Sequence, residues 1–97
     1  MDEAVLNALC AIDDPEIGVN IVDLGLIYGA RRDSDGVAVA MTATSRSCPL
    51  GEFLRDEAAT RLGAAFRDAP SIDVKLVWTP AWSPARMSEA ARRELRP

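Results

Sequence analysis

The sequence predicts an α+β fold: a two-layer α/β domain in the order α-β-β-α-β-α, with its helices on one face of a three-stranded mixed sheet. Three observations lead to this prediction. Apolar residues recur every three to four positions in three segments, which is typical of helices packed on one side. In three other segments apolar residues alternate with polar or small ones, which is typical of strands. A helical segment between the second and third strands indicates a crossover, so these two strands should be parallel.

The N-terminal segment predicts a short helix followed by a packed loop. Asp2 can cap this helix. The apolar residues that recur on its buried face are Val5, Leu9 and Ile12. Pro15 ends the helix, because proline lacks a backbone N–H and disfavours helical geometry at the residue before it. The loop over residues 15–23 is rich in apolar side chains, so we expect it to pack against the domain.

Residues 24–31 and 37–44 predict two strands that form a hairpin. The first strand is weakened by two glycines, whereas the second alternates regularly. Residues 33–36 lie between them and contain aspartate, serine and glycine, which are typical of turns.

Pro49 marks the start of the longest predicted helix, which should run to about Arg67. Proline is favoured at the first helical position, and this would make Cys48 the N-cap residue. The apolar residues that form one stripe along the helix are Leu50, Leu54, Ala58, Leu62 and Phe66. Residues 72–78 then alternate as the third strand, and Pro84 can open a last helix. The order of the strands in the sheet stays open.

Length, net charge and composition exclude several classes of protein and of site. The 97 residues are the length of one domain, 1–97, and the net charge of −4 argues against non-specific binding to nucleic acid. The longest apolar runs fall far short of the roughly 20 residues that span a membrane. The first residues are acidic and lack the basic stretch of a signal peptide, so we expect a cytoplasmic protein. The absence of histidine excludes imidazole chemistry and histidine-ligated metals.

Cys48 is the first candidate for a functional side chain. At an N-cap its sulfur would face the unpaired N–H groups of Leu50 and Gly51, and Arg46 is near in sequence. These groups favour the thiolate, which is both a nucleophile and a soft metal ligand. The alternative is a buried cysteine that only fills space. Cys10 lies within an apolar helical pattern and is predicted to belong to the core.

A second candidate group consists of the acidic residues Asp14, Glu16 and Asp23, together with hydroxyl residues that precede Cys48. If the acidic loop faces Cys48, its carboxylates could complete a metal shell or accept the thiol proton. Thr44 and Ser45 could donate hydrogen bonds to a thiolate or a bridging sulfide. The structural alternative is that the carboxylates cap turns and the hydroxyls belong to a strand and its turn.

Three blocks of this sequence, taken in order, closely resemble the SufT and PaaD-like metal–sulfur cluster assembly proteins. The blocks are the stretch Asp14-Pro-Glu-Ile-Gly-Val-Asn-Ile-Val-Asp-Leu-Gly-Leu-Ile-Tyr28, the stretch Met41-Thr-Ala-Thr-Ser-Arg-Ser-Cys-Pro-Leu50, and Val77-Trp-Thr-Pro-Ala-Trp82 with Met87-Ser-Glu. The resemblance implies a two-layer α/β domain like those of iron–sulfur scaffold proteins, and a role in maturing iron–sulfur proteins. It implies a site at Asp14, Glu16, Thr44, Ser45 and Cys48, with Cys48 central.

The predicted function is therefore an iron–sulfur cluster assembly or delivery factor whose thiolate ligand is Cys48. A cluster usually takes four thiolates, so a cluster held transiently needs a homodimer, an external thiol or the cysteines of a client protein. The predicted partners are iron–sulfur client proteins and other assembly factors, without nucleic acid or membrane. Two alternatives stay open: an adaptor that docks clients without holding iron, and a thiol enzyme with Cys48 as nucleophile.

Overall fold

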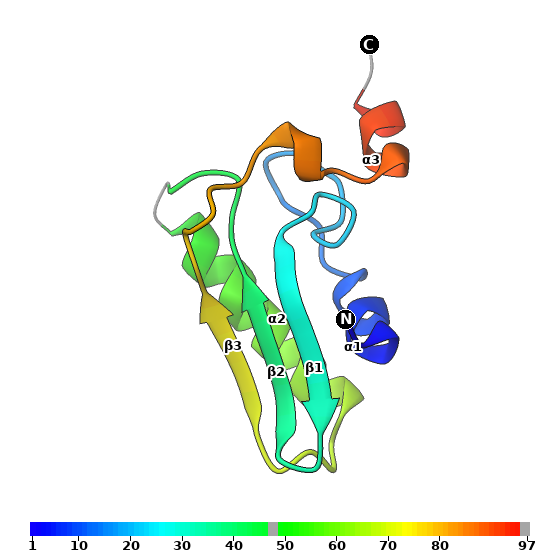
Figure 1. The fold of residues 1–97 in the computed structure, drawn as a ribbon, viewed down its shortest axis with the longest axis vertical. Helices are drawn as coiled ribbons and strands as arrows, with labels where there is room; N and C mark the ends of the chain where they lie inside the picture. Colours follow the sequence, from blue (N-terminus) through cyan, green and yellow to red (C-terminus); the bar gives the residue numbers. More distant parts are fainter. Residues whose placement is uncertain (47–48, 96–97) are drawn as a thin grey trace.

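The computed structural model describes residues 1–46 and 49–95 and confirms the predicted α+β fold (Figure 1). The elements in chain order are α1 (Glu3–Leu9), β1 (Ile27–Asp33), β2 (Gly36–Met41), α2 (Leu50–Ala65), β3 (Ile72–Leu76), the 3-10 helix η1 (Pro84–Arg86) and α3 (Glu89–Glu94). None of the helices in these two ranges is both long and apolar enough to cross a lipid bilayer.

The three strands lie in the order β1-β2-β3, which the sequence had left open. β1 and β2 pair antiparallel, with Ala30 opposite Val39. β2 and β3 pair parallel, with Val39 opposite Val74, as the crossover through α2 predicts. The central strand therefore carries both kinds of pairing, and β1 and β3 form the two edges.

The first strand begins three residues later than the sequence predicts. Gly25 has a φ of +79°, a conformation that suits glycine and interrupts an extended strand. Regular pairing then starts at Ile27. Leu24 and Leu26 are fully buried nevertheless, so the apolar pattern identified the core correctly although it misplaced the strand boundary.

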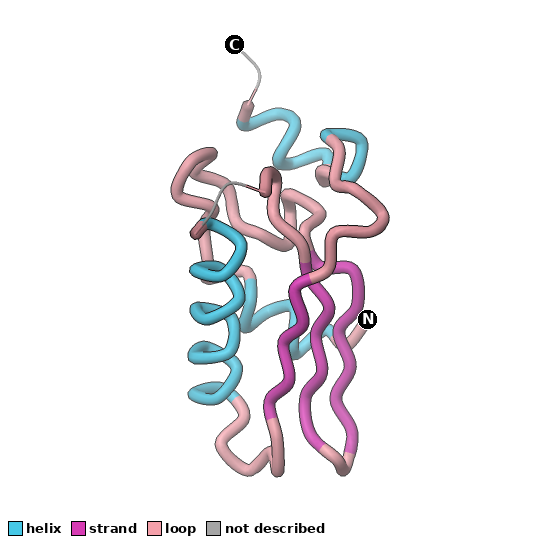
Figure 2. Tube along the Cα trace, turned by 90° about the vertical axis from the view of Figure 1, so that its left-hand side faces the viewer, coloured by secondary structure: helices cyan, strands magenta, loops and turns pink. Residues whose placement is uncertain are grey.

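Helices α1 and α2 form the second layer of the domain (Figures 1 and 2). Four residues of the predicted stripe of α2 are buried: Leu50, Leu54, Ala58 and Leu62. Phe66, the fifth, is partly buried and packs against the edge of the core. The predicted face of α1 is confirmed, because Val5 and Leu9 are fully buried and Ile12 nearly so. The loop over residues 15–23 packs down as expected, with Val19 and Ile21 in the core.

The C-terminal helix differs from the prediction in where it starts. Pro84 opens only the short helix η1, and Met87 then adopts an extended conformation with ψ of 145°. Ser88 begins α3 instead, because its hydroxyl accepts the N–H of Ala91 at 3.1 Å. α3 lies beyond the end of the sheet, next to the loops that follow α1 (Figure 1).

Candidate functional site

The acidic loop folds around Asp14, whose side chain is fully buried at 0% exposure. Its Oδ1 accepts the backbone N–H of Glu16 at 2.8 Å and that of Ile17 at 3.3 Å. The Asp14 carbonyl accepts the N–H of Gly18 at 2.7 Å, which closes a tight turn. These bonds replace water around a carboxylate whose burial would otherwise be costly. Asp14 therefore holds the backbone of this loop in place from its buried side.

Asp14 also joins this loop to the end of β2. The hydroxyl of Thr44 donates to Asp14 Oδ2 at 3.4 Å, a long hydrogen bond between residues that are 30 positions apart. Thr44 is half-buried and comes three residues after the last residue of β2. We call the region formed by residues 13–18 and 42–46 the motif end of the sheet.

The other predicted site residues are distributed as follows. Glu16 is exposed, and only its backbone N–H takes part in the bond to Asp14. Ser45 is half-buried and follows Thr44 directly. Cys48, the predicted centre of the site, lies outside the described residues. The structure thus brings Asp14 and Thr44 together, whereas Glu16, two residues after Asp14, is exposed at the surface.

The predicted N-cap of α2 is wrong by one residue. Pro49 occupies the N-cap with φ of −106° and ψ of 23°, which is outside the helical region. Its carbonyl accepts the N–H of Phe53 at 2.9 Å, so the first helical bond starts there. Proline fits a cap as well as a first helical position, because neither place uses a backbone N–H.

The first turn of α2 packs tightly on the sheet. Gly51 is buried, and a Cβ atom there would lie 2.9 Å from Leu76 Cδ2 and 3.2 Å from the ring of Trp78. The same ring is covered by Arg46, whose guanidinium lies 5.0 Å from its centroid. Such a cation–π contact stabilises an exposed arginine modestly. Trp78 therefore connects the start of α2 to the last described residue before Cys48.

The prediction that Cys10 belongs to the core is wrong. Cys10 is the C-cap residue of α1 and is exposed. The residues that fill the buried face are Val5, Leu9 and Ile12, and the thiol of Cys10 lies off that face. Partial desolvation of the sulfur, together with the charge of Asp23, raises the pKa of the Cys10 thiol. The Cys10 thiol is therefore accessible to solvent, but its raised pKa disfavours the thiolate.

Asp23 does not join Asp14 and has a structural role. Its Oδ2 accepts the side-chain amide of Asn20 at 2.7 Å, and its carbonyl accepts the N–H of Ser88 at 2.7 Å. Asn20 in turn accepts the N–H groups of Val22 and Asp23. Sequence reasoning missed Asn20, although an asparagine three residues before an aspartate is typical of a turn closed by side chains.

Trp82 is held against the body of the domain. Its indole N–H donates to the carbonyl of Leu24 at 2.6 Å, and the ring packs against the core. The segment after β3 is thereby fixed onto the loop that precedes β1.

Thr42 carries the one unexplained polar group at the motif end. This residue is 1% exposed, and its hydroxyl has no hydrogen-bond partner among the residues that the structure describes. Its backbone N–H is paired, because it donates to the carbonyl of Leu26 at 2.9 Å. Buried hydroxyls are usually paired, and this exception marks the interior of the motif end as unusual.

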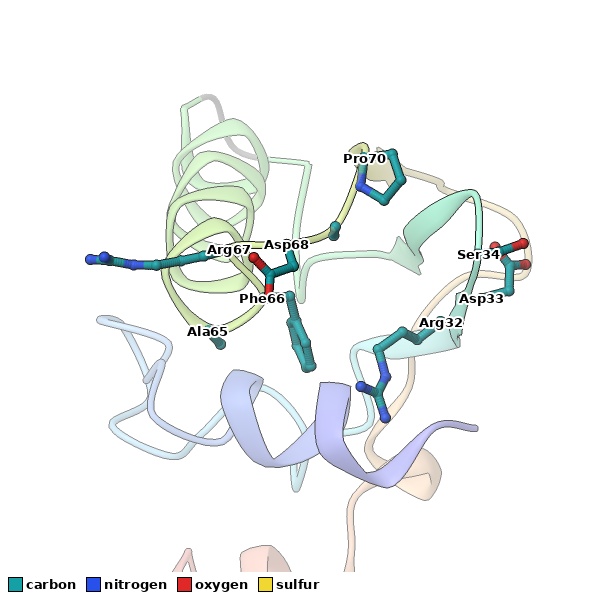
Figure 3. A pocket seen from close by; sticks show the side chains of 9 residues that line it. Arg32, Asp33, Ser34, Ala65, Phe66, Arg67, Asp68 and Pro70 are labelled. Atoms are coloured by element: carbon teal, nitrogen blue, oxygen red, sulfur yellow. The ribbon is translucent and has the colours of Figure 1, made fainter.

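The opposite end of the sheet holds a hollow of about 440 Å³ between residues 32–34 and residues 65–70, which we call the turn end (Figure 3). The guanidinium of Arg32 lies 5.2 Å from the centre of the Phe66 ring and 3.5 Å from Asp2. The charged groups here pair with one another or face solvent. Of the predicted site residues that the structure describes, none lies at this end. Within residues 1–46 and 49–95, no group of three or more cysteines and carboxylates is placed to hold a metal ion.

Comparisons with known proteins agree with the predicted family. The family described as iron–sulfur cluster assembly protein matches residues 2–74. The chain is 39% identical over 93 residues to the Fe-S protein maturation auxiliary factor YitW of Bacillus subtilis, covering 95% of this chain and 90% of that protein. It is 41% identical over 80 residues to the Fe-S protein maturation auxiliary factor SufT of Staphylococcus aureus, covering 81% and 90%.

A solved structure agrees as well. The crystal structure of a domain of unknown function, DUF59, from Bacillus anthracis superposes with a TM-score of 0.88 at 35% identity, covering 96% of this chain and 89% of that one. The matches run through the Asp14 loop, both paired strands and α2, which are the elements that build the motif end. The chain belongs to the iron–sulfur cluster assembly protein family.

Proposed function

We propose that this protein matures iron–sulfur proteins by assembling or delivering a cluster, with the thiolate of Cys48 as the ligand that contacts the cargo. The observation that carries the proposal is the contact between the buried Asp14 and Thr44 at the end of β2. It ties the acidic loop to the segment that leads into Cys48. Names of relatives such as Fe-S protein maturation auxiliary factor support the same process.

Each proposed site residue has a role that fits its surroundings. Asp14 is a positioning residue, because it is buried and its oxygens are used by backbone N–H groups and by Thr44. Glu16 is exposed and is free to accept the thiol proton or to bind iron as a hard ligand. Thr44 orients the segment before Cys48 through its single O–H, which donates to Asp14. Ser45, the next residue, donates a hydrogen bond toward the thiolate or a sulfide of the cargo.

One thiolate is too few for a cluster, which is normally held by four. The proposed cargo is therefore bound transiently and completed by thiols from outside the chain. A second copy, an external thiol and the client's own cysteines are the three sources. The proposed partners are iron–sulfur client proteins and other assembly factors, and the proposed compartment is the cytoplasm. Neither nucleic acid nor membrane has a part in this proposal.

The test compares the two cysteines of the chain under anaerobic conditions. The wild type, Cys48→Ala and Cys10→Ala are each incubated with ferrous iron, sulfide and an apo client enzyme. Client activity and iron content are then followed over time. We expect Cys48→Ala to reduce transfer to the background without added protein, and Cys10→Ala to transfer as the wild type does. Circular dichroism of each variant checks that the fold is intact.

A second candidate function, an adaptor that docks clients without holding iron, is favoured by Phe53. Phe53 is 51% exposed on the first turn of α2. An exposed aromatic residue favours docking, because aromatic residues are enriched at protein interfaces. If the adaptor alternative is right, Phe53→Ser should abolish client maturation while Cys48→Ala leaves it unchanged. If Cys48 carries the cargo, Cys48→Ala is inactive at any client concentration. Phe53→Ser then raises only the client concentration that is required.

A further inference from the structure

Among residues 1–46 and 49–95, none covers the outer edge of β3. β3 is the last strand in the order β1-β2-β3, and in both views no other described segment lies beside its outer side (Figures 1 and 2). Within the described residues, the backbone bonds at its two ends run inward, toward β2. An open strand edge is a template for pairing with another strand, so natural proteins usually protect such edges or use them.

The parallel ladder determines which backbone groups of β3 face outward. The carbonyl of Ser71 accepts the N–H of Val37 at 2.9 Å, and the N–H of Val77 donates to the carbonyl of Met41 at 2.7 Å. The backbone groups of Ser71 and Val77, which flank β3, therefore face β2. Facing alternates along a strand, and the register pairs Val39 with Val74. The N–H and C=O groups of Ile72, Val74 and Leu76 therefore point to the open edge.

The sequence of β3, Ile72-Asp-Val-Lys-Leu76, is complementary to itself when read in the opposite direction. In an antiparallel pair centred on Val74, Asp73 lies opposite Lys75 of the second copy, and Ile72 lies opposite its Leu76. A shift by two residues in either direction places Asp73 opposite Asp73, or Lys75 opposite Lys75. Opposite charges in directly facing positions stabilise a sheet and like charges destabilise it.

The geometry of an antiparallel ladder favours the same register. Residues whose backbone groups face outward form the hydrogen-bonded pairs, so Val74 would bond to Val74 of the second copy. Asp73 and Lys75 then occupy the non-hydrogen-bonded positions, where facing side chains approach most closely. Both are exposed, whereas Ile72 and Leu76 are partly buried on the side of α2. Pairing would thus continue the apolar layer on one face and form ion pairs on the other.

We propose that a second copy of this chain pairs with β3 in the antiparallel register centred on Val74, giving one continuous sheet through both copies. A two-fold axis at Val74 places the motif ends of the two copies at opposite ends of the sheet. Leu76 of one copy and Leu76 of the other are then separated by four residues along the ladder, roughly 13 Å, and the motif ends are farther apart still. In this dimer, a cluster held at one motif end is completed by an external thiol or by the client's cysteines, rather than by the second copy. The interface itself does not depend on the proposed function.

Charge reversal at β3 tests the register. Sedimentation of the wild type from roughly 10 μM to 1 mM should show a monomer–dimer equilibrium. Asp73→Lys and Lys75→Asp should each raise the dimer dissociation constant by about tenfold or more, because facing charges become alike. The double variant with both changes should restore it. An equimolar mixture of the two single variants should form a heterodimer, since facing charges are again opposite. Asp68→Lys, which makes the same change in net charge on an exposed residue of another segment, should leave it unchanged.

Amide hydrogen exchange gives a readout at single residues. The amides of Ile72, Val74 and Leu76 should become protected as concentration rises, whereas those of Asp73 and Lys75 should be protected at every concentration. A wild type that is monomeric throughout the range overturns the proposal, and so does a dimer that is insensitive to Asp73→Lys. A single variant that dissociates without rescue by the double variant also overturns the register. If an added extended peptide protects these amides in a monomer, the edge serves a client segment and the second copy is the wrong occupant.

Discussion

Asp14 at the motif end and Asp2, which contacts Arg32 of the turn end, each hold a turn of backbone, and they differ in how deeply they are buried. At the motif end, Asp14 is 0% exposed and its carboxylate is surrounded by backbone N–H groups and Thr44. Toward the turn end, Asp2 accepts the N–H of Val5 at 3.0 Å and contacts Arg32, but its side chain keeps 24% of its exposure. The Asp14 carboxylate thus holds its loop from inside the protein, whereas the Asp2 carboxylate caps α1 at the surface.

The two ends also differ in what their polar groups cost the folded state. The turn end has the hollow of about 440 Å³ and several charges, yet those charges are solvated or paired and cost little to keep. The motif end contains a buried carboxylate and a buried hydroxyl without a partner among the described residues, and both are costly unless the surrounding structure compensates for them. The motif end is therefore distinguished by its buried polar groups, and the turn end by its hollow.

The largest expected effect is at Asp14. Asp14→Ala leaves the N–H groups of Glu16 and Ile17 and the hydroxyl of Thr44 without their acceptor, so we expect the free energy of unfolding to fall by about 2–3 kcal/mol. Asp68→Ala, at an exposed carboxylate of the turn end, should change it by less than about 0.5 kcal/mol. Urea unfolding measures both. Equal effects would mean that burial does not distinguish the two ends.

Two glycines of α2 sharpen the same comparison. A Cβ at Gly51 would lie 2.9 Å from Leu76 and 3.2 Å from Trp78, whereas a Cβ at Gly63 would meet nothing within 4 Å. Gly51→Ala should destabilise the fold by about 1–2 kcal/mol, because the rigid indole cannot move away easily. Gly63→Ala should stabilise it by up to about 1 kcal/mol through helix propensity alone. Thermal unfolding that shows a gain at both glycines would contradict the tight packing of the first turn of α2.

The fold was predictable from the sequence because its elements are locally encoded. Periodic apolar residues identified α1, β2, α2 and β3, and the hairpin and the crossover fixed which strands are antiparallel and which are parallel. Strand order was not predictable, since local pattern does not determine which edge of the hairpin receives β3. The misplaced helix starts at Pro49 and Pro84 have one cause: proline is compatible with several positions around a helix N-terminus, and only the backbone angles decide among them.

The site was predictable only in part. The resemblance named Asp14 and Thr44, but a contact across 30 residues has no local signal in either segment. Cys10 shows the opposite failure: an apolar pattern assigned it to the core, although a residue at the last turn of a short helix can turn away from that core. The unpaired hydroxyl of Thr42 had no signal either, since threonine is a common strand residue and pairing depends on distant atoms.

A smaller effect of opposite sign is expected at the two threonines of the motif end. Thr42→Val removes a buried hydroxyl without a described partner and keeps the shape, so we expect a gain of about 1 kcal/mol. Thr44→Val removes the donor to Asp14 and should cost up to about 1 kcal/mol. Urea unfolding and the client maturation assay are run on both variants. A loss of stability in Thr42→Val would show that its hydroxyl has a partner in the folded protein.

The smallest expected effect is the pH dependence that Asp2 contributes near the turn end. The N–H of Val5 lowers the pKa of Asp2 below its ordinary value of 3.8, and Arg32 acts in the same direction. A carboxyl with a lowered pKa in the folded state contributes stability that is fully present above the unfolded value and is lost as pH falls through the folded value. The melting temperatures of wild type and Asp2→Asn, compared from about pH 7 down to pH 2, should therefore differ by a constant amount above the unfolded pKa and converge as pH falls through the folded pKa. Arg32→Gln should narrow the difference without abolishing it, because the Val5 bond remains. A difference that persists unchanged in acid would show that Asp2 caps α1 by geometry alone and that its charge is not used.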